Sequence, residues 1–222
     1  TVKQLAGGDG HSLLLTTQGE MYSWGACACG QLGLPDLSAL PKDLEDYPFL
    51  PLPCRIPMPT SSRADLRIVK IACGDAHSCA ISDAGELFTW GGGGCGQLGL
   101  KTGGLSKDED GSNHDHRTNA PIRIVAVACG KAHTVCVSAS HEVYAFGAGA
   151  CGQLGVENLT SYPHDDDGYP YQPLPVKLDF FDGTALHMPR ICAVSCGDSH
   201  TLFVTPQGDV FACGANQCGQ CG

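Results

Sequence analysis

The sequence predicts an all-β fold, a β-propeller of four-stranded blades, with about four blades in its 222 residues. Three observations lead to this prediction. One motif recurs four times, centred on His11, His77, His133 and His200, with steps of 66, 56 and 67 residues. Each copy consists of short apolar runs separated by glycine-containing turns, and none shows the spacing of an amphipathic helix. A period of about 60 residues with four short strands is typical of a propeller blade, and a solenoid is the structural alternative.

Each copy carries the same residue types at fixed distances from its histidine. Glycine lies three residues before the histidine, and serine or threonine follows it directly. An aromatic residue and a glycine lie thirteen and fourteen residues after it, and a cysteine at eighteen opens a Gly-Gln-Leu-Gly loop. The fourth copy differs, because Cys213 replaces the aromatic residue and Cys221 replaces the leucine. Besides the four histidines, we expect these positions to be structural: Trp24, Trp90 and Phe146; Gly25, Gly91, Gly147 and Gly214; Gln31, Gln97, Gln153 and Gln220.

The second copy shows the order of the predicted strands. Residues 66–72 form the first strand, 77–82 the second and 86–90 the third. Asp83-Ala84-Gly85 joins the last two as a tight turn in which glycine adopts a positive φ. The third copy has His141 at this turn position, so we expect a left-handed histidine there at some cost in stability.

A fourth strand is predicted shortly before each following copy. The candidates are Cys54-Arg55-Ile56, Ile122-Arg123-Ile124 and Pro175-Val176-Lys177-Leu178. Each would be the fourth strand of its blade.

We predict that 1–222 is a single repeat domain with surface excursions between the copies. Because the chain starts without Met inside one repeat and stops inside another, we expect it to be a piece of a larger protein. In the last excursion, Tyr162, Tyr169 and Tyr171 are expected to pack on their own blade, and contact with a partner is the alternative. The repeat cores span about 7–33, 73–99, 129–155 and 196–222, and the variable loops span 34–66, 100–122 and 156–190.

Charge placement limits the partners. The net charge is −10, and 15 of the 23 acidic residues lie in the three variable loops, whereas the repeat cores contain one basic residue, Lys131. Nucleic-acid binding requires clustered lysine and arginine, so no direct nucleic-acid partner is expected. No apolar run suggests a signal peptide or a membrane span, so no membrane partner is expected either.

The chain has 14 cysteines, and ten of them recur at equivalent repeat positions. A residue that recurs at one structural position most simply packs the same kind of site each time. We therefore predict reduced thiols that pack as small apolar residues in an intracellular protein. Disulfides in a secreted protein are the alternative.

Several groups contain chemically capable residues without the context that the chemistry needs. The histidines have cysteines four residues before or two after them, but equivalent residues of adjacent blades should lie far apart, so we expect each histidine to hydrogen-bond a loop of its own blade. Gly94–Gly99 matches the dinucleotide pattern without a following helix, and Cys218–Cys221 has redox spacing without one. His114–His116 and His164–Asp167 are interpreted as solvated loops. We predict no catalytic, cofactor-binding or metal-binding residues.

The combined pattern of Cys-Gly-x-x-His-Ser/Thr, a turn glycine, Trp-Gly and Gly-Gln-Leu-Gly resembles the repeat of the regulator of chromosome condensation family. The match covers about half of the residues, in all four copies. This resemblance implies a propeller, typically of seven blades, in which each repeat supplies one blade. The remaining blades would come from the rest of the parent chain or from another molecule.

The resemblance also implies a protein–protein interaction module within a larger intracellular protein, cytoplasmic or nuclear, with another protein as partner and no cofactor. The alternative is a guanine-nucleotide exchange factor for a Ran-like small GTPase, the founding activity of the family. An exchange factor would press a loop and acidic side chains against the phosphate-binding site of the GTPase, without covalent catalysis. The repeat motif assigns no exchange or binding residues, so a nucleotide-release assay is needed to distinguish the two.

Overall fold

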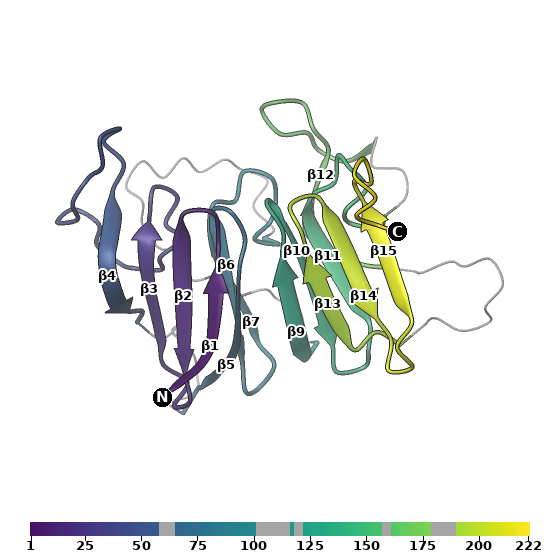
Figure 1. Cartoon of the computed structure of the whole chain (residues 1–222), viewed down its shortest axis with the longest axis horizontal. Helices are drawn as coiled ribbons and strands as arrows, with labels where there is room; N and C mark the ends of the chain where they lie inside the picture. The colour runs from purple at the N-terminus through teal and green to yellow at the C-terminus, as the bar shows by residue number, and fades with distance from the viewer. Residues whose placement is uncertain (58–64, 101–115, 118–121, 157–160, 179–189) are drawn as a thin grey trace.

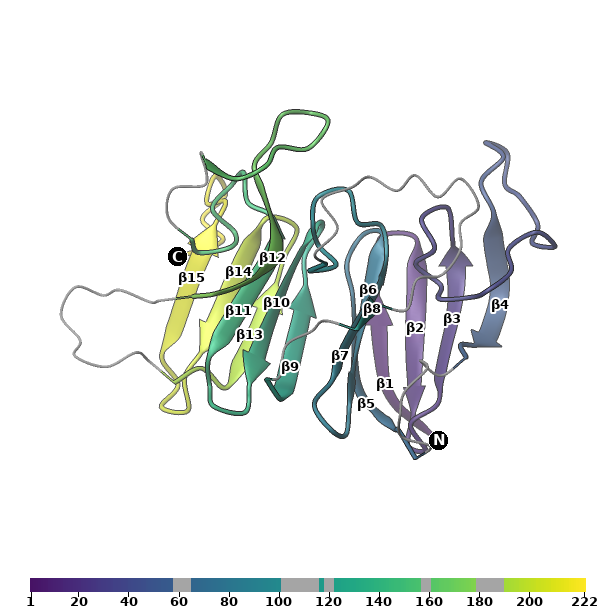
Figure 2. The same cartoon turned by 180° about the vertical axis from the view of Figure 1, so that it is seen from behind.

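The computed structural model describes residues 1–57, 65–100, 116–117, 122–156, 161–178 and 190–222. The chain forms four antiparallel sheets that stand side by side in chain order (Figure 1, and from behind in Figure 2). The predicted all-β propeller blades are confirmed. The strands are β1 (Val2–Gly7), β2 (His11–Thr16), β3 (Met21–Ala26) and β4 (Phe49–Arg55); β5 (Ile68–Cys73), β6 (His77–Ser82), β7 (Leu87–Gly91) and β8 (His116–Arg117); β9 (Ile124–Cys129), β10 (His133–Ser138), β11 (Val143–Ala148) and β12 (Tyr171–Lys177); and β13 (Ala193–Cys196), β14 (His200–Val204) and β15 (Val210–Gly214).

The apolar core lies between neighbouring blades rather than within one blade. One cluster joins the first and second blades through side chains such as Leu13 and Trp90, and another joins the second and third through Ile81 and Phe146. The first strands of consecutive blades, β1, β5, β9 and β13, contact one another in turn. These inner strands therefore line the centre of the arc, and each blade depends on its neighbours for burial.

The turn between the second and third strands has the predicted backbone. Gly19, Gly85 and Gly208 have φ values of 82°, 83° and 95°. His141 occupies the same turn in the third blade with φ 67°. Its Nδ1 lies 3.1 Å from the carbonyl oxygen of Ile191, a hydrogen bond that offsets part of the strain of a left-handed histidine.

One predicted fourth strand is wrong. Ile122-Arg123-Ile124 was expected to end the second blade, but Ile124 begins β9, the inner strand of the third blade, because its side chain is buried in the core between these blades. The outer strand of the second blade is instead β8, which pairs with β7.

The other two predicted fourth strands, at residues 54–56 and 175–178, overlap the ends of longer strands, β4 and β12. β4 and β12 are each seven residues long and contain two prolines. Proline is tolerated in these strands because they form the outer edge of their sheets, where one side of the backbone has no strand to pair with. Within the described residues the fourth sheet has three strands. None of the described segments is a helix long and apolar enough to cross a membrane.

Candidate functional site

The repeated histidines connect adjacent blades through buried hydrogen bonds. The Nε2 atom of His77 lies 2.9 Å from the Thr134 hydroxyl, which belongs to the next blade. His11 and Ser78 are 2.8 Å apart in the same way, and His133 and Thr201 are 3.0 Å apart. The expectation of a partner in the histidine's own blade is therefore wrong.

Each hydroxyl also donates to the backbone carbonyl of the repeat glutamine in the histidine's own blade. The distance is 2.9 Å from Ser78 to Gln31, 2.8 Å from Thr134 to Gln97 and 2.7 Å from Thr201 to Gln153. We call each set of histidine, hydroxyl and glutamine carbonyl an inter-blade relay.

The relay determines which ring nitrogen carries the proton. A hydroxyl has one proton to donate. Since that proton goes to the glutamine carbonyl, the hydroxyl must accept from Nε2–H of the histidine. The Nδ1 atoms of His11, His77 and His133 are buried without a hydrogen-bond partner. The rings are therefore neutral, because a proton on Nδ1 would be a buried, unsatisfied donor.

Burial affects the histidine pKa values in the direction that this arrangement requires. Desolvation lowers the pKa of His11 to about 4, and the nearby Asp75 backbone offsets a smaller part of this shift. The pKa of His133 is lowered to about 4, mainly by desolvation and to a smaller extent by the nearby His200. Both rings hence resist protonation in the folded state.

The aromatic position packs against the loop of the preceding blade. Trp90 Nε1 donates to the Gln31 carbonyl over 3.0 Å, and Gly33 lies directly against the indole, where a Cβ would be 2.9 Å from Nε1. Phe146 occupies the equivalent place without a donor, and the thiol of Cys213 lies 3.5 Å from the Gln153 carbonyl. The glutamine side chains act locally, each accepting from the backbone N–H two residues earlier.

Replacing Trp90 with Phe is expected to lower the free energy of unfolding by about 1 kcal/mol. The change removes one hydrogen bond, but Ser78 continues to satisfy the Gln31 carbonyl. Phe146 shows that a phenyl ring fits the site, since its side chain is fully buried. Urea unfolding measures the change, and a loss above about 3 kcal/mol would contradict the equivalence of the two positions.

Two of the variable loops contain the same hairpin, which the sequence reasoning missed. Residues 41–53 and 163–175 both start with proline, have aspartate at the third position, end the turn with Tyr-Pro and finish with Pro-x-Pro. In both hairpins the aspartate carboxylate, Asp43 or Asp165, accepts from the backbone N–H groups two and four residues later. The shared spacing was visible in the sequence, but it lay outside the repeat register.

The tips of these hairpins are acidic and aromatic. Tyr47 is 53% exposed, Tyr169 is 58% exposed and Leu44 is fully exposed. The first tip carries Asp43, Glu45 and Asp46, and the second carries Asp165, Asp166 and Asp167. The loops leading into β4 and β12 extend from the same side of the sheets in Figures 1 and 2. An open, largely apolar hollow lies beside the first hairpin, lined in part by Leu40 and Leu50.

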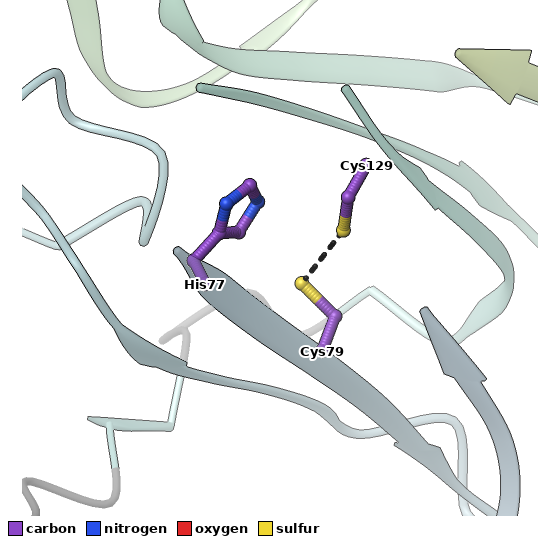
Figure 3. Close-up of side chains that lie close together, drawn as sticks. All are labelled: His77, Cys79 and Cys129. Carbon is purple, nitrogen blue, oxygen red and sulfur yellow. Dashed lines mark hydrogen bonds between the residues drawn. The ribbon is translucent and has the colours of Figure 1, made fainter. Parts of the chain in front are cut away.

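One group of metal-capable side chains comes together across two blades. Among the described residues, ligand atoms of His77, Cys79 and Cys129 all lie within 4.8 Å of one another, and the two sulfur atoms are 3.3 Å apart (Figure 3). The hydrogen bond to Cys79, with burial, raises the pKa of Cys129 well above its usual value. The sequence did not reveal this group, because Cys129 belongs to the repeat after the one that contains the other two residues.

A family model described as the RCC1-like domain matches residues 1–222. The chain belongs to this family. Among curated relatives, it is 33% identical over 223 residues to human "Probable E3 ubiquitin-protein ligase HERC3", covering all of this chain and 18% of the relative. It is also 33% identical over 225 residues to the "Ultraviolet-B receptor UVR8" of Arabidopsis thaliana, covering all of this chain and 43% of the receptor.

Solved RCC1-like structures show the same fold. Human WBSCR16 matches with a TM-score of 0.77 and 25% identity, over 98% of this chain and 50% of that one. Prp20p of Saccharomyces cerevisiae matches with a TM-score of 0.68 and 25% identity, over 96% and 45%. The chain thus spans half or less of the length of these relatives.

The two ends of this RCC1-like arc differ from its interior. Val2 and Leu5 on β1 are 53% and 65% exposed, whereas the equivalent Ile68 and Ile71 on β5 are 1% and 2% exposed. The interior positions are covered by the preceding blade, which β1 lacks in this chain. At the opposite end, His200 has no following blade and is half-buried.

The structure describes most of the remaining sequence candidates. Gly96 and Gly99 adopt positive φ in the loop after β7, and the residues after Leu100 lie outside the described part of the chain. Cys221 is half-buried with its thiol 3.3 Å from the Ala215 carbonyl, and Cys218 is exposed. His114 and Asp115 lie outside the described residues. All 14 cysteines are free thiols in this structure.

Proposed function

We propose that this RCC1-like chain is a protein-interaction module that binds a basic, extended segment of a partner protein through its two acidic hairpins. The observation that carries the proposal is the recurrence of one hairpin, with the same hydrogen bonds and an exposed tyrosine at its tip, on the first and third blades. The residues of the repeat register are engaged between the blades, so they leave recognition to the loops.

The chemistry of the tips favours arginine and lysine as their ligands. Carboxylates form charge-assisted, bidentate hydrogen bonds with guanidinium groups, and a tyrosine ring attracts a cation over its face. Asp43 and Asp165 already accept hydrogen bonds that shape the hairpins, so the neighbouring Glu45, Asp166 and Asp167 are the available acceptors. Because these groups are exposed, binding should weaken as salt is added.

The hairpins should act together on a partner with two basic clusters. Both extend from one side of the arc (Figure 1). Once one cluster is bound, the second binds at a high effective concentration, which can raise the overall affinity by about 100-fold or more.

A fluorescent peptide with two arginine-lysine clusters tests the proposal by fluorescence anisotropy. We expect Tyr47→Ala and Tyr169→Ala each to weaken the affinity for this peptide about 10-fold. The double variant should bind it only as tightly as the parent binds a peptide with a single basic cluster. Asp198→Asn is the matched control, because Asp198 is an exposed carboxylate outside both hairpins, and it should bind like the parent. Unchanged binding by the double variant would contradict the proposal.

Guanine-nucleotide exchange is the second candidate, favoured by the relationship to Prp20p, whose structure was described with its "Binding Properties to Gsp1p and Histones". Mixing the chain in catalytic amounts with Ran-like small GTPases loaded with fluorescent nucleotide separates the two functions. We expect no acceleration of nucleotide release, and acceleration would favour exchange.

We further propose that the module works inside a larger intracellular protein, cytoplasmic or nuclear, and performs no covalent chemistry itself. The exposed apolar face of β1 and the half-buried His200 are suited to contact further blades of the same kind. The thiols, of which burial raises the pKa of Cys73 and Cys136 to about 12, fit a reducing compartment.

A further inference from the structure

We propose that His77, Cys79 and Cys129 bind a Zn²⁺ ion that joins the second and third blades. His77 and Cys79 lie on β6, and Cys129 ends β9 of the next blade. Figure 3 shows the two sulfur atoms pointing toward each other beside the His77 ring. Thiolate and imidazole are the ligands that zinc prefers in proteins, and a water molecule would complete the tetrahedron.

The group is specific to one of the three blade pairs. Two residues after its histidine, the first blade has Leu13 and the third has Val135, both fully buried. Those blade pairs therefore offer one sulfur, Cys73 or Cys196, instead of two. An apolar side chain fills this position elsewhere, so Cys79 is not required by the repeat.

The spacing of the sulfur atoms favours a metal ion over a disulfide. Zn–S bonds of about 2.3 Å hold two sulfurs of a tetrahedral site about 3.8 Å apart. The observed separation is 3.3 Å, so the sulfurs need to move apart by about half an ångström, whereas an S–S bond of about 2.05 Å requires them to approach by about 1.2 Å.

The charge of the site also suits the ion. Zn²⁺ replaces the protons of the two thiols, which leave to solvent, and the resulting centre with two thiolates is neutral. A neutral centre is compatible with the apolar cluster that contains Cys79, Ile81, Ile124 and Phe146. His77 and Cys79 are fully buried and Cys129 is half-buried, so the ion would lie in the interface between the two blades.

The histidine can supply a nitrogen without creating a charge. Nε2 of His77 carries a proton for Thr134, and Nδ1 has no partner. Moving the proton to Nδ1 frees Nε2 for the ion, with a metal–nitrogen bond in place of the hydrogen bond to Thr134. The proton on Nδ1 is then a buried donor without an acceptor, a cost that the coordination bonds to zinc have to offset. Blades that are joined by a hydrogen bond are then joined by coordination bonds.

Metal titration of the reduced full chain tests the proposal. The background variant has serine at the five exposed cysteines, Cys29, Cys54, Cys151, Cys192 and Cys218, which would otherwise bind metal independently. We expect it to bind one equivalent of Zn²⁺ and to release two protons, measured by calorimetry in buffers of different ionisation enthalpy. Added Co²⁺ should give the visible d–d and thiolate charge-transfer bands of a tetrahedral site.

Matched substitutions locate the ion. Cys79→Val, which introduces the residue type of the third blade, and Cys129→Ala should each lower zinc affinity about 100-fold or more and abolish the cobalt bands. Cys73→Ala removes the equivalent sulfur of the first blade pair and should leave the zinc affinity and the cobalt bands unchanged. Circular dichroism confirms that each variant is folded. Binding that survives Cys79→Val, binding lost in Cys73→Ala, or a reduced background chain that binds no zinc would overturn the proposal, as would a Cys79–Cys129 disulfide as the only product of air exposure with zinc present.

Discussion

Lowering the pH from 7 to 5 is expected to reduce the free energy of unfolding by about 4 kcal/mol through His11 and His133 together. Burial lowers the pKa of each ring from 6.5 to about 4 in the folded state. The unfolded chain therefore takes up two protons that the folded chain refuses between these values. Stability is fully present above pH 6.5 and is lost as the pH falls toward 4. Urea unfolding at a series of pH values measures the loss.

A histidine variant separates this effect from the titration of carboxylates. His133→Gln removes one of the two groups. Between pH 4 and 6.5, the slope of the free energy of unfolding against pH should therefore correspond to about one proton fewer taken up on unfolding than in the parent. His164→Gln, which changes a histidine at an exposed hairpin position, is the control for the substitution itself. An equal slope in His133→Gln and the parent would contradict a neutral, buried ring.

Replacing Gly91 with Ala is expected to lower the free energy of unfolding by about 3 kcal/mol. Gly91 has φ 101°, a conformation that alanine rarely adopts. A Cβ there would also lie 2.6 Å from the Ala76 carbonyl oxygen and 3.1 Å from Cα of Gln31 in the first blade. Strain and overlap add, because the methyl group meets backbone that cannot rotate away. Thermal and urea unfolding measure the loss.

Gly94, in the loop that follows β7, provides the matched control. A Cβ at Gly94 meets no heavy atom within 4 Å, and its φ is not positive. Gly94→Ala should change the free energy of unfolding by less than about 0.5 kcal/mol. Equal losses of stability in the two variants would contradict the view that positive φ and backbone overlap cause the loss at Gly91.

The sequence was sufficient for the blades because each strand and turn is encoded locally. His77 starts β6 at the predicted residue, and Gly85 turns with the predicted positive φ. The outer strand of the second blade could not be located, because an outer strand has one neighbour and needs little apolar patterning. Ile122 and Ile124 are apolar because they pack between the second and third blades, and not because they belong to an outer strand.

Contacts between blades were hidden from the sequence. Register gives the position of a residue within a blade but not the group that faces it from the next one. The partner of His77, Thr134, and the approach of Cys129 to Cys79 both depend on how blades stack. The twin hairpins were hidden for another reason, because they lie in the variable loops, outside the repeat register that aligns the copies.

The protonation of the relay histidines tests most directly whether buried, neutral histidines join the blades. Long-range ¹H–¹⁵N correlation spectra in metal-free buffer at pH 7 distinguish the two neutral ring forms and the charged ring. The relays predict that His11, His77 and His133 are neutral with the proton on Nε2. A proton on Nδ1, or a charged ring, at any of these three positions would contradict the account.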